Sequence, residues 1–228
     1  MIVFIRRIET KDIPLLYNLY KDVFSGYPWY EDLACVNCKT LYTNKKIREE
    51  SLDRVIPIGN IASCLKCNNP LQLVSYYPEI IDQIQLINEA AGLDGFIGYI
   101  ALIDNSPAGF TWGYKMPAKR TVSVNFPEIN PALKAEGITE EQSFYGAETG
   151  VVEKYQGIGL GRKLVSLRAK DSFELGYRIF LNRTINPKMR KILQSLFSGV
   201  EPQILFKDPE TQSQWFSYDY KNYSKEKQ

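Results

Sequence analysis

The stretch that decides the fold is FYGAETGVVEKYQGIGLG, residues 144–161. Its first half, up to Val152, is rich in aromatic and β-branched residues and predicts a β-strand. Its second half ends in Gly157, Gly159 and Gly161 and leads into a sequence with helical spacing. A strand that enters a helix through such a turn leaves backbone N–H groups at the positive end of the helix dipole. The sequence therefore predicts a phosphate-binding turn at this point.

Specific residues exclude two common phosphate loops. A Walker A loop needs a lysine and then a serine or threonine directly after its last glycine, but Arg162 follows Gly161. A Rossmann turn needs its third glycine where this chain has Arg162, and it needs an acidic residue at the end of the next strand, where none occurs. Both interpretations fail on particular residues.

The flanking sequence predicts strands and helices in alternation. Strands are expected at 2–8, 96–103, 108–114, 177–181, 204–206 and 215–218. Helices are expected at 10–24 (capped by Thr10), 78–92, 160–176 and 187–197. The turn-rich residues 104–107 indicate an antiparallel hairpin. Residues 116–142 hold three prolines and no clean periodicity, so we expect a long excursion of the kind that often carries binding loops.

Several of these segments resemble the GNAT family of N-acetyltransferases. Gln156–Gly161 is similar to its Gln/Arg-x-x-Gly-x-Gly/Ala loop, Glu148–Val152 to its fourth strand, and Asn182–Met189 to the exit of its fifth strand. The order of elements is also similar, and the resemblance covers most of the chain except about 29–77. It implies an α+β fold, with a mixed, mostly antiparallel central sheet flanked by helices, and acetyl transfer from acetyl-CoA to an amine.

The resemblance also implies roles for individual residues. Backbone N–H groups from Ile158 to Arg162 would hold the pyrophosphate, and Val151 and Val152 would bond the pantetheine arm as an added strand does. Asn186 would contact the pantetheine. The implied cofactor-binding residues are Val151, Val152, Gln156, Gly157, Ile158, Gly159, Leu160, Gly161, Arg162 and Asn186.

Acetyl transfer to an amine needs a base for the ammonium proton and stabilisation of the thioester oxygen and the leaving thiolate. The carboxylate of Glu148 is the candidate base, acting directly or through water, with an ion pair as the structural alternative. A backbone N–H near Val152 is the candidate oxyanion donor. The family's usual tyrosine acid is absent, because Leu193 occupies its place. Tyr145 and Tyr218 are candidate substitutes, although a structural role is the default for each.

The four cysteines form two Cys-x-x-Cys pairs, with 25 residues between Cys38 and Cys64. The pairs Cys35/Cys38 and Cys64/Cys67 can surround Zn²⁺ tetrahedrally, and a saturated four-cysteine shell makes a structural site. Disulfides and a single redox pair are the alternatives. We expect residues 29–77 to form an inserted zinc-ribbon-like module, within an interrupted domain of residues 1–220 and before a polar tail of residues 221–228. The resemblance to the GNAT family implies that the module borders the acceptor site, where it could form a wall of the cleft, hold a partner or bind nucleic acid.

Composition narrows the function classes. The chain has 228 residues and no histidine, which excludes Ser-His-Asp and Cys-His catalysis and any His metal ligand. Its net charge of +2 gives no strong field for nucleic acid or membrane, and the mixed charges of 29–77 also make nucleic acid an unlikely partner. The apolar run Met1–Ile5 is too short for a signal or a membrane span, so we expect a cytoplasmic protein.

These observations lead to one main hypothesis and two alternatives. The main hypothesis is an acetyl-CoA-dependent N-acetyltransferase that acts on an amine of a small molecule, peptide or protein. The first alternative is a non-catalytic acyl-CoA-binding module that recruits a protein or nucleic-acid partner through its zinc ribbon. The second is a nucleic-acid-binding zinc protein, whose affinity would fall steeply with salt. A protein partner or a homodimer is compatible with the main hypothesis.

Overall fold

A computed structural model describes residues 1–24, 33–35, 37–38, 40–42, 63–69, 71–73, 87–116, 129–184, 186–207 and 214–223. The expected helix 78–92 lies largely outside the described residues, and its last part, 87–91, is helical. Residues 117–128 of the expected excursion also lie outside them.

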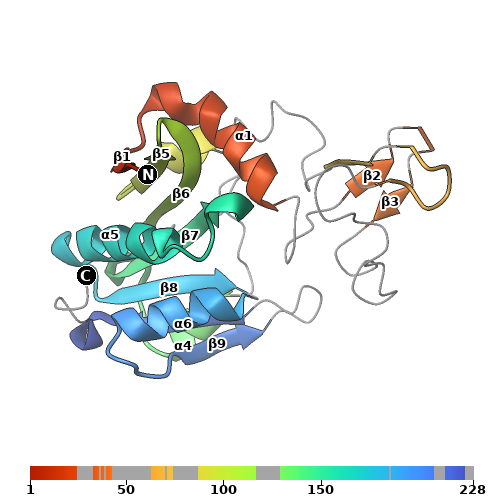
Figure 1. The fold of residues 1–228 in the computed structure, drawn as a ribbon. Coiled ribbons are helices and arrows are strands. Elements are labelled where there is room, and N and C mark those ends of the chain that lie inside the picture. Colours follow the sequence, from red (N-terminus) through yellow and green to blue (C-terminus); the bar gives the residue numbers. More distant parts are fainter. Residues whose placement is uncertain are drawn as a thin grey trace.

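The main body is one seven-stranded sheet with strand order β1-β5-β6-β7-β8-β10-β9 (Figure 1). Its strands are β1 (Val3–Arg7), β5 (Ile97–Ile103), β6 (Ser106–Lys115), β7 (Ser143–Val151), β8 (Ile179–Thr184), β9 (Gln203–Lys207) and β10 (Gln214–Asp219). Only the β7–β8 pair is parallel, whereas the other neighbours are antiparallel. The predicted α+β class, with a mixed and mostly antiparallel sheet, is confirmed.

Helices cover both faces of this sheet. The helices are α1 (Ile13–Phe24), α4 (Ile129–Ala135), α5 (Leu160–Glu174) and α6 (Pro187–Leu196). Leu16 of α1 and Leu133 of α4 share one buried cluster with Phe110 and Trp112 of β6. Leu193 of α6 belongs to a second cluster, together with residues of α5. The two clusters define an α1/α4 face and an α5/α6 face.

Two local predictions need correction. Thr10 does not cap α1: it begins a 3-10 turn, η1 (Thr10–Asp12), and the Asp12 carboxylate accepts the Glu9 N–H at 2.9 Å in a capping box. The excursion 116–142 is also more regular than expected, because it contains α4 and a second 3-10 turn, η3 (Glu140–Gln142). Pro131 masks the short helical pattern, which buries Leu133 against the core.

Two smaller elements complete the fold. The cysteine module, by which we mean the four cysteines with β2 (Leu33–Cys35), β3 (Leu41–Tyr42) and β4 (Leu71–Leu73), forms a separate antiparallel sheet of order β3-β2-β4. At the other end of the chain, η5 (Tyr220–Asn222) follows β10, and the Tyr223 ring lies 5.4 Å from Phe173. The first residues of the expected polar tail therefore pack on the main body.

Candidate functional site

The parallel strands β7 and β8 separate partway along their length. They pair from Ser143 with Ile179 to Gly146 with Asn182, where the Asn182 side-chain amide donates to the Gly146 carbonyl at 2.8 Å. Beyond this pair β7 continues to Val151 and β8 to Thr184 without pairing to each other. We call the gap between residues 147–151 and 183–184 the strand split. It leaves one edge of β7 without a strand partner among the described residues.

A bulge in β7 lies beside the strand split. Trp112 pairs with Glu148 and Tyr114 pairs with Tyr145, so the register between β6 and β7 shifts by one residue between these two pairs. A β-bulge bends its strand and increases the local twist, which directs β7 away from a neighbour. The bulge therefore accounts for the separation of β7 from β8.

Backbone direction decides which groups face the strand split. The Val152 N–H donates to the Ala108 carbonyl at 2.9 Å and so points toward β6. Because bonded and non-bonded pairs alternate along an antiparallel ladder, the N–H and C=O groups of Thr149 and Val151 point the other way, toward the strand split. The Val152 N–H itself is therefore used within the sheet, and the oxyanion donor predicted near Val152 would have to be a neighbouring N–H such as that of Val151 or Thr149.

The glycine turn lies between β7 and α5, after a 3-10 turn, η4 (Glu153–Tyr155). Gly157 and Gly159 have φ of 81° and 84°, in the left-handed region that favours glycine, and Gly159 is the N-cap of α5. A Cβ at either position would meet no atom of the described residues within 4 Å, so the space in front of the turn is open with respect to them. The turn and the helix end form the concave, N–H-lined shape that suits an anion.

The other predicted turn residues have different surroundings. The Gln156 side chain donates to the Val151 carbonyl at 3.2 Å and so braces the turn against β7. Leu160, the first residue of α5, is buried against Ala108 of β6, whereas Ile158 is about half exposed. The side chain of Arg162 is exposed in the first turn of α5, and Gly161 lies inside the helix, where a Cβ would make an ordinary contact with Val151.

The candidate base, Glu148, lies opposite Trp112 and therefore on the α1/α4 face. Tyr114 and Tyr145 are on the same face, where their rings meet edge to face at 5.7 Å. Burial, and then the neighbouring Tyr145 and Glu148, raise the pKa of Tyr114 well above its ordinary value. This tyrosine thus stays protonated and can donate a hydrogen bond near Glu148, a role that the sequence analysis did not assign to it.

Asn186, which is predicted to contact the pantetheine beyond the end of β8, makes a hydrogen bond within the protein instead. The Asn186 side-chain oxygen accepts the Lys188 N–H at 2.9 Å and caps α6, with Pro187 at the first helical position. Leu193, at the place of the missing tyrosine, is fully buried in the core of the α5/α6 face. The site therefore has no hydroxyl at that position.

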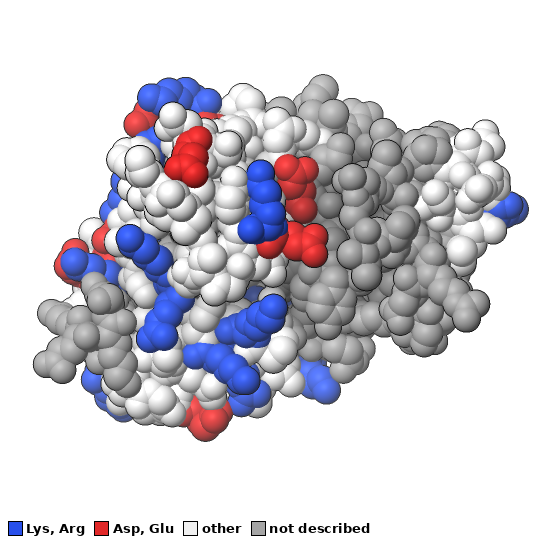
Figure 2. All heavy atoms as spheres, viewed as in Figure 1, with Lys and Arg blue, Asp and Glu red and all other residues white. Residues whose placement is uncertain are grey.

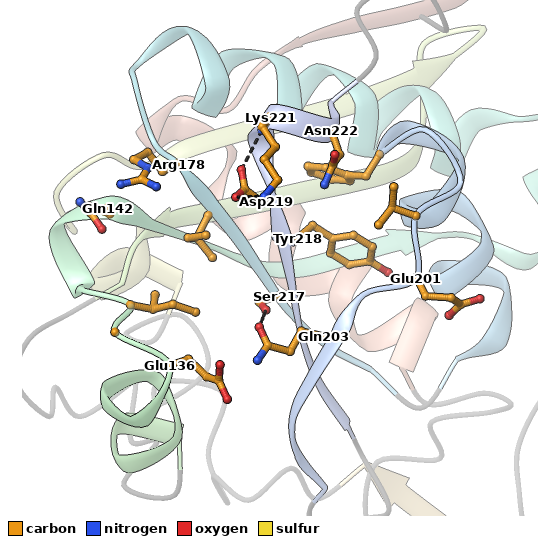
Figure 3. A pocket seen from close by; sticks show the side chains of 15 residues that line it. Glu136, Gln142, Arg178, Glu201, Gln203, Ser217, Tyr218, Asp219, Lys221 and Asn222 are labelled. Carbon is orange, nitrogen blue, oxygen red and sulfur yellow. Dashed lines mark hydrogen bonds and ion pairs between the residues drawn. The ribbon is translucent and has the colours of Figure 1, made fainter.

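Tyr218, the other candidate acid, lies at the opposite end of β8. It pairs with Phe180 and lines a pocket of about 370 Å³ together with Arg178 and Asp219, as Figure 3 shows. Its hydroxyl is buried, and burial raises its pKa. Since Arg178 precedes β8 and the strand split follows Asn182, this pocket is not the strand split, and Tyr218 is unsuitable as its acid.

Exposed cations gather on the α5/α6 face (Figure 2). Those on the two helices are Arg162, Lys163, Lys170, Lys188 and Lys191. The segment of α6 carries no acidic residue. A surface of this charge attracts a ligand with several phosphates.

The four cysteine sulfurs of the cysteine module converge. They lie within 4.8 Å of one another, with 3.3 Å between Cys35 and Cys67 and 3.5 Å between Cys38 and Cys64, and none is in a disulfide. Backbone N–H groups of Cys38 and Lys66 point at the first sulfur of each pair at 3.4 Å. The Asn69 N–H groups lower the pKa of the Cys67 thiol to about 6.

This geometry fits a four-coordinate zinc ion. A tetrahedron with Zn–S bonds of about 2.3 Å has sulfurs about 3.8 Å apart, close to the observed spacings. The clustering also argues against a redox Cys-x-x-Cys motif. Such a motif needs only two thiols, whereas here all four sulfurs lie within 4.8 Å of one another. Four thiols without histidine or carboxylate are a donor set typical of structural zinc sites in other proteins.

The mostly antiparallel seven-stranded sheet with helices on both faces is a GNAT-like α+β fold. No protein-family model matches the chain, and no curated protein sequence matches it. Solved structures do. An N-acetyltransferase from Staphylococcus aureus Mu50 has a TM-score of 0.53 and 12% identity, with 96% of this chain and 98% of that chain covered.

Two further similar structures contain the expected cofactor or a part of it. The structure of yncA from Salmonella typhimurium with its cofactor acetyl-CoA has a TM-score of 0.54 and 11% sequence identity. The match covers 96% of this chain and 94% of that chain. The paia N-acetyltransferase from Thermoplasma acidophilum in complex with coenzyme A has a TM-score of 0.51 and 12% sequence identity. The match covers 96% of this chain and 100% of that chain. At these identities the likeness establishes the fold. In the described part of the chain, no helix is long and apolar enough to cross a membrane.

Proposed function

We propose that the chain is an acetyl-CoA-dependent N-acetyltransferase with a structural zinc site. One observation carries the proposal: the edge of β7 at Thr149 and Val151, which has no strand partner among the described residues, is followed after η4 by the open glycine turn at the N-terminus of α5. A ligand that joins an extended, amide-bearing arm to a pyrophosphate would fit this arrangement, with the arm along the strand edge and the pyrophosphate at the anion site. Coenzyme A has such an arm and such a pyrophosphate.

The proposed roles follow from these positions. N–H groups of residues 158–162 hold the pyrophosphate, and the exposed cations of α5 and α6 add attraction for the phosphates. Thr149 and Val151 bond the pantetheine arm, so the thioester lies near the bulge. Glu148, on the α1/α4 face, takes a proton from the amine, and Tyr114 is the nearby hydroxyl donor.

Replacing Glu148 by Gln tests the catalytic part of this proposal. With a good acceptor found in an amine panel, Glu148→Gln is expected to lower kcat for coenzyme A release by about 10²- to 10³-fold, because the amide cannot take the proton. Acetyl-CoA affinity, measured by calorimetry, should stay within about twofold. Glu153→Gln, which changes an exposed carboxylate in η4, is the matched control.

Two results would contradict the proposal in different ways. Unchanged turnover in Glu148→Gln would remove Glu148 from the mechanism. Tight acetyl-CoA binding without release on any amine would instead favour the non-catalytic acyl-CoA-binding module, and the burial of Leu193 at the acid position is the observation that favours that alternative.

A further inference from the structure

The β7 bulge is fastened by one residue of α5, Arg168, whose side chain is completely buried. Its Nη1 donates to the carbonyl oxygens of Trp112 and Glu148, both at 2.8 Å, and to the Thr149 hydroxyl at 3.2 Å. Trp112 and Glu148 form the last regular pair before the register shift. The guanidinium therefore ties β6 to β7 where the bulge begins.

The surrounding residues make space for this guanidinium. A Cβ at position 146 would lie 2.6 Å from Arg168 Nη2 and 2.7 Å from the Phe180 ring, so any larger residue there would displace the guanidinium or the ring. The guanidinium carbon also lies 5.4 Å from the centre of the Phe180 ring, within the range of a cation–π contact.

Burying a cation at this place is unfavourable unless hydrogen bonds compensate. In the described part of the chain, Nε and Nη2 have no hydrogen-bond partner, so Nη1 makes all three bonds. An apolar side chain of similar volume would fill the same space without this penalty. The arginine is therefore better explained by what it holds than by packing alone.

The atoms that Arg168 holds are adjacent to the proposed cofactor edge. The Glu148 carbonyl accepts a second hydrogen bond from the Thr111 hydroxyl at 3.0 Å, and the Thr111 and Thr149 hydroxyls are 2.8 Å apart. A shift of one residue in β7 would exchange the groups that face β6 with those that face the strand split. The network thus determines which backbone groups face the strand split.

We propose that Arg168 is a positioning residue, which fixes β7 at the bulge and thereby directs the backbone of Thr149 and Val151 and the side chain of Glu148 toward the cofactor and acceptor. This inference rests on the proposed acetyltransferase function. It assigns to a buried residue of α5, 20 positions after Glu148, control over the geometry of the reacting groups.

The first test replaces Arg168 by Met, which keeps the approximate volume and removes the donors. Acetyl-CoA affinity and kcat are each expected to fall about tenfold or more, because two carbonyls lose charge-assisted hydrogen bonds. Hydrogen exchange should increase at residues 146–149 more than along α5. Tyr220→Phe, which removes buried hydrogen bonds to the Ala169 carbonyl at 3.1 Å and to the Ser172 hydroxyl of the same helix, is the matched control and should change neither kcat nor affinity.

The second test measures the activity of Arg168→Lys as a function of pH. If Arg168 had only a structural role, the activity of this variant would not depend on pH differently from that of the native protein. Burial lowers the pKa of Arg168 to about 10, so the native side chain stays charged between pH 6 and 8.5. A lysine buried at the same place has its pKa lowered by several units and loses its proton in this range. Its titratable neighbours are Tyr220, Tyr145 and Glu148. The kcat of the variant relative to the native protein should therefore be highest at pH 6 and fall as the pH rises.

The outcomes separate this inference from the proposed function. If the native chain does not bind acetyl-CoA, the proposed function fails, and this inference fails with it. If the native chain binds and Arg168→Met binds and turns over equally well, only the positioning role of Arg168 is overturned. A uniform increase in exchange along α5, or a flat pH profile for Arg168→Lys, would likewise overturn it and leave the proposed function standing.

Discussion

Protein purified without chelator is expected to carry one Zn²⁺ per chain, and the variant Cys64→Ser to carry none. The four sulfurs already converge within 4.8 Å, and three thiolates cannot complete a tetrahedral all-cysteine shell. Structural zinc sites in small modules supply about 10 kcal/mol or more of apparent binding free energy, so loss of the metal should unfold the cysteine module. Metal analysis by mass spectrometry and limited proteolysis at 33–73 measure the two effects.

The control for this experiment is Lys66→Ala. Lys66 contributes its backbone N–H to the Cys64 sulfur, but its side chain is exposed, so this variant should keep its zinc. The thermal transition of the main sheet should persist in Cys64→Ser, because its two large core clusters contain no described residue of the cysteine module. Well under one zinc per chain in the native protein would refute the site.

Sequence patterns predicted those elements of the fold that have a clear period. The strand 144–152, predicted from its aromatic and β-branched residues, and the helix 160–176, predicted from its three- to four-residue repeat, correspond to β7 and α5. The short helix α4 has only seven residues and contains Pro131, so no period is visible in its sequence. Its position is decided by the burial of Leu133, which is a tertiary contact.

The candidate site was predictable in part. The conformation of the glycine turn follows from its own residues, and Gly157 and Gly159 do have the left-handed backbone that only glycine adopts readily. Whether the Val152 N–H is free to bind a ligand does not follow from the local sequence. It depends on the register with Ala108, which lies on another strand. The register in turn depends on the bulge between the Trp112–Glu148 and Tyr114–Tyr145 pairs, which only the strand pairing locates.

The position of the Arg168 side chain could not be predicted from the sequence either. In sequence it is one of several charged residues on a helix, where exposure is the ordinary expectation. It is buried because Gly146, 22 positions earlier, leaves space for its guanidinium and because two strand carbonyls face it. Only the three-dimensional arrangement of α5 on β6 and β7 brings these features together.

Replacing Gly159 by Val is expected to abolish most acetyl-CoA binding, whereas Gly161→Ala should leave it nearly unchanged. At Gly159, φ is 84°, and a β-branched residue in this region is severely strained. Its side chain would also project into the open space in front of the turn, where the pyrophosphate is proposed to bind. Loss of two hydrogen bonds to a charged group lowers affinity about 100-fold or more.

Gly161 provides the contrast, because its backbone is helical and a Cβ there would lie 3.6 Å from the Val151 side chain, an ordinary contact. Alanine inside a helix is favoured over glycine by about 1 kcal/mol, so Gly161→Ala should melt at the same or a higher temperature. Calorimetry with acetyl-CoA and with S-acetylpantetheine, which lacks the pyrophosphate, separates the contributions. Gly159→Val should weaken acetyl-CoA binding and spare the truncated ligand, because the truncated ligand contacts only the edge of β7. Equal weakening of both ligands would show that the substitution damages β7 itself, and no weakening of either would remove the glycine turn from the binding site.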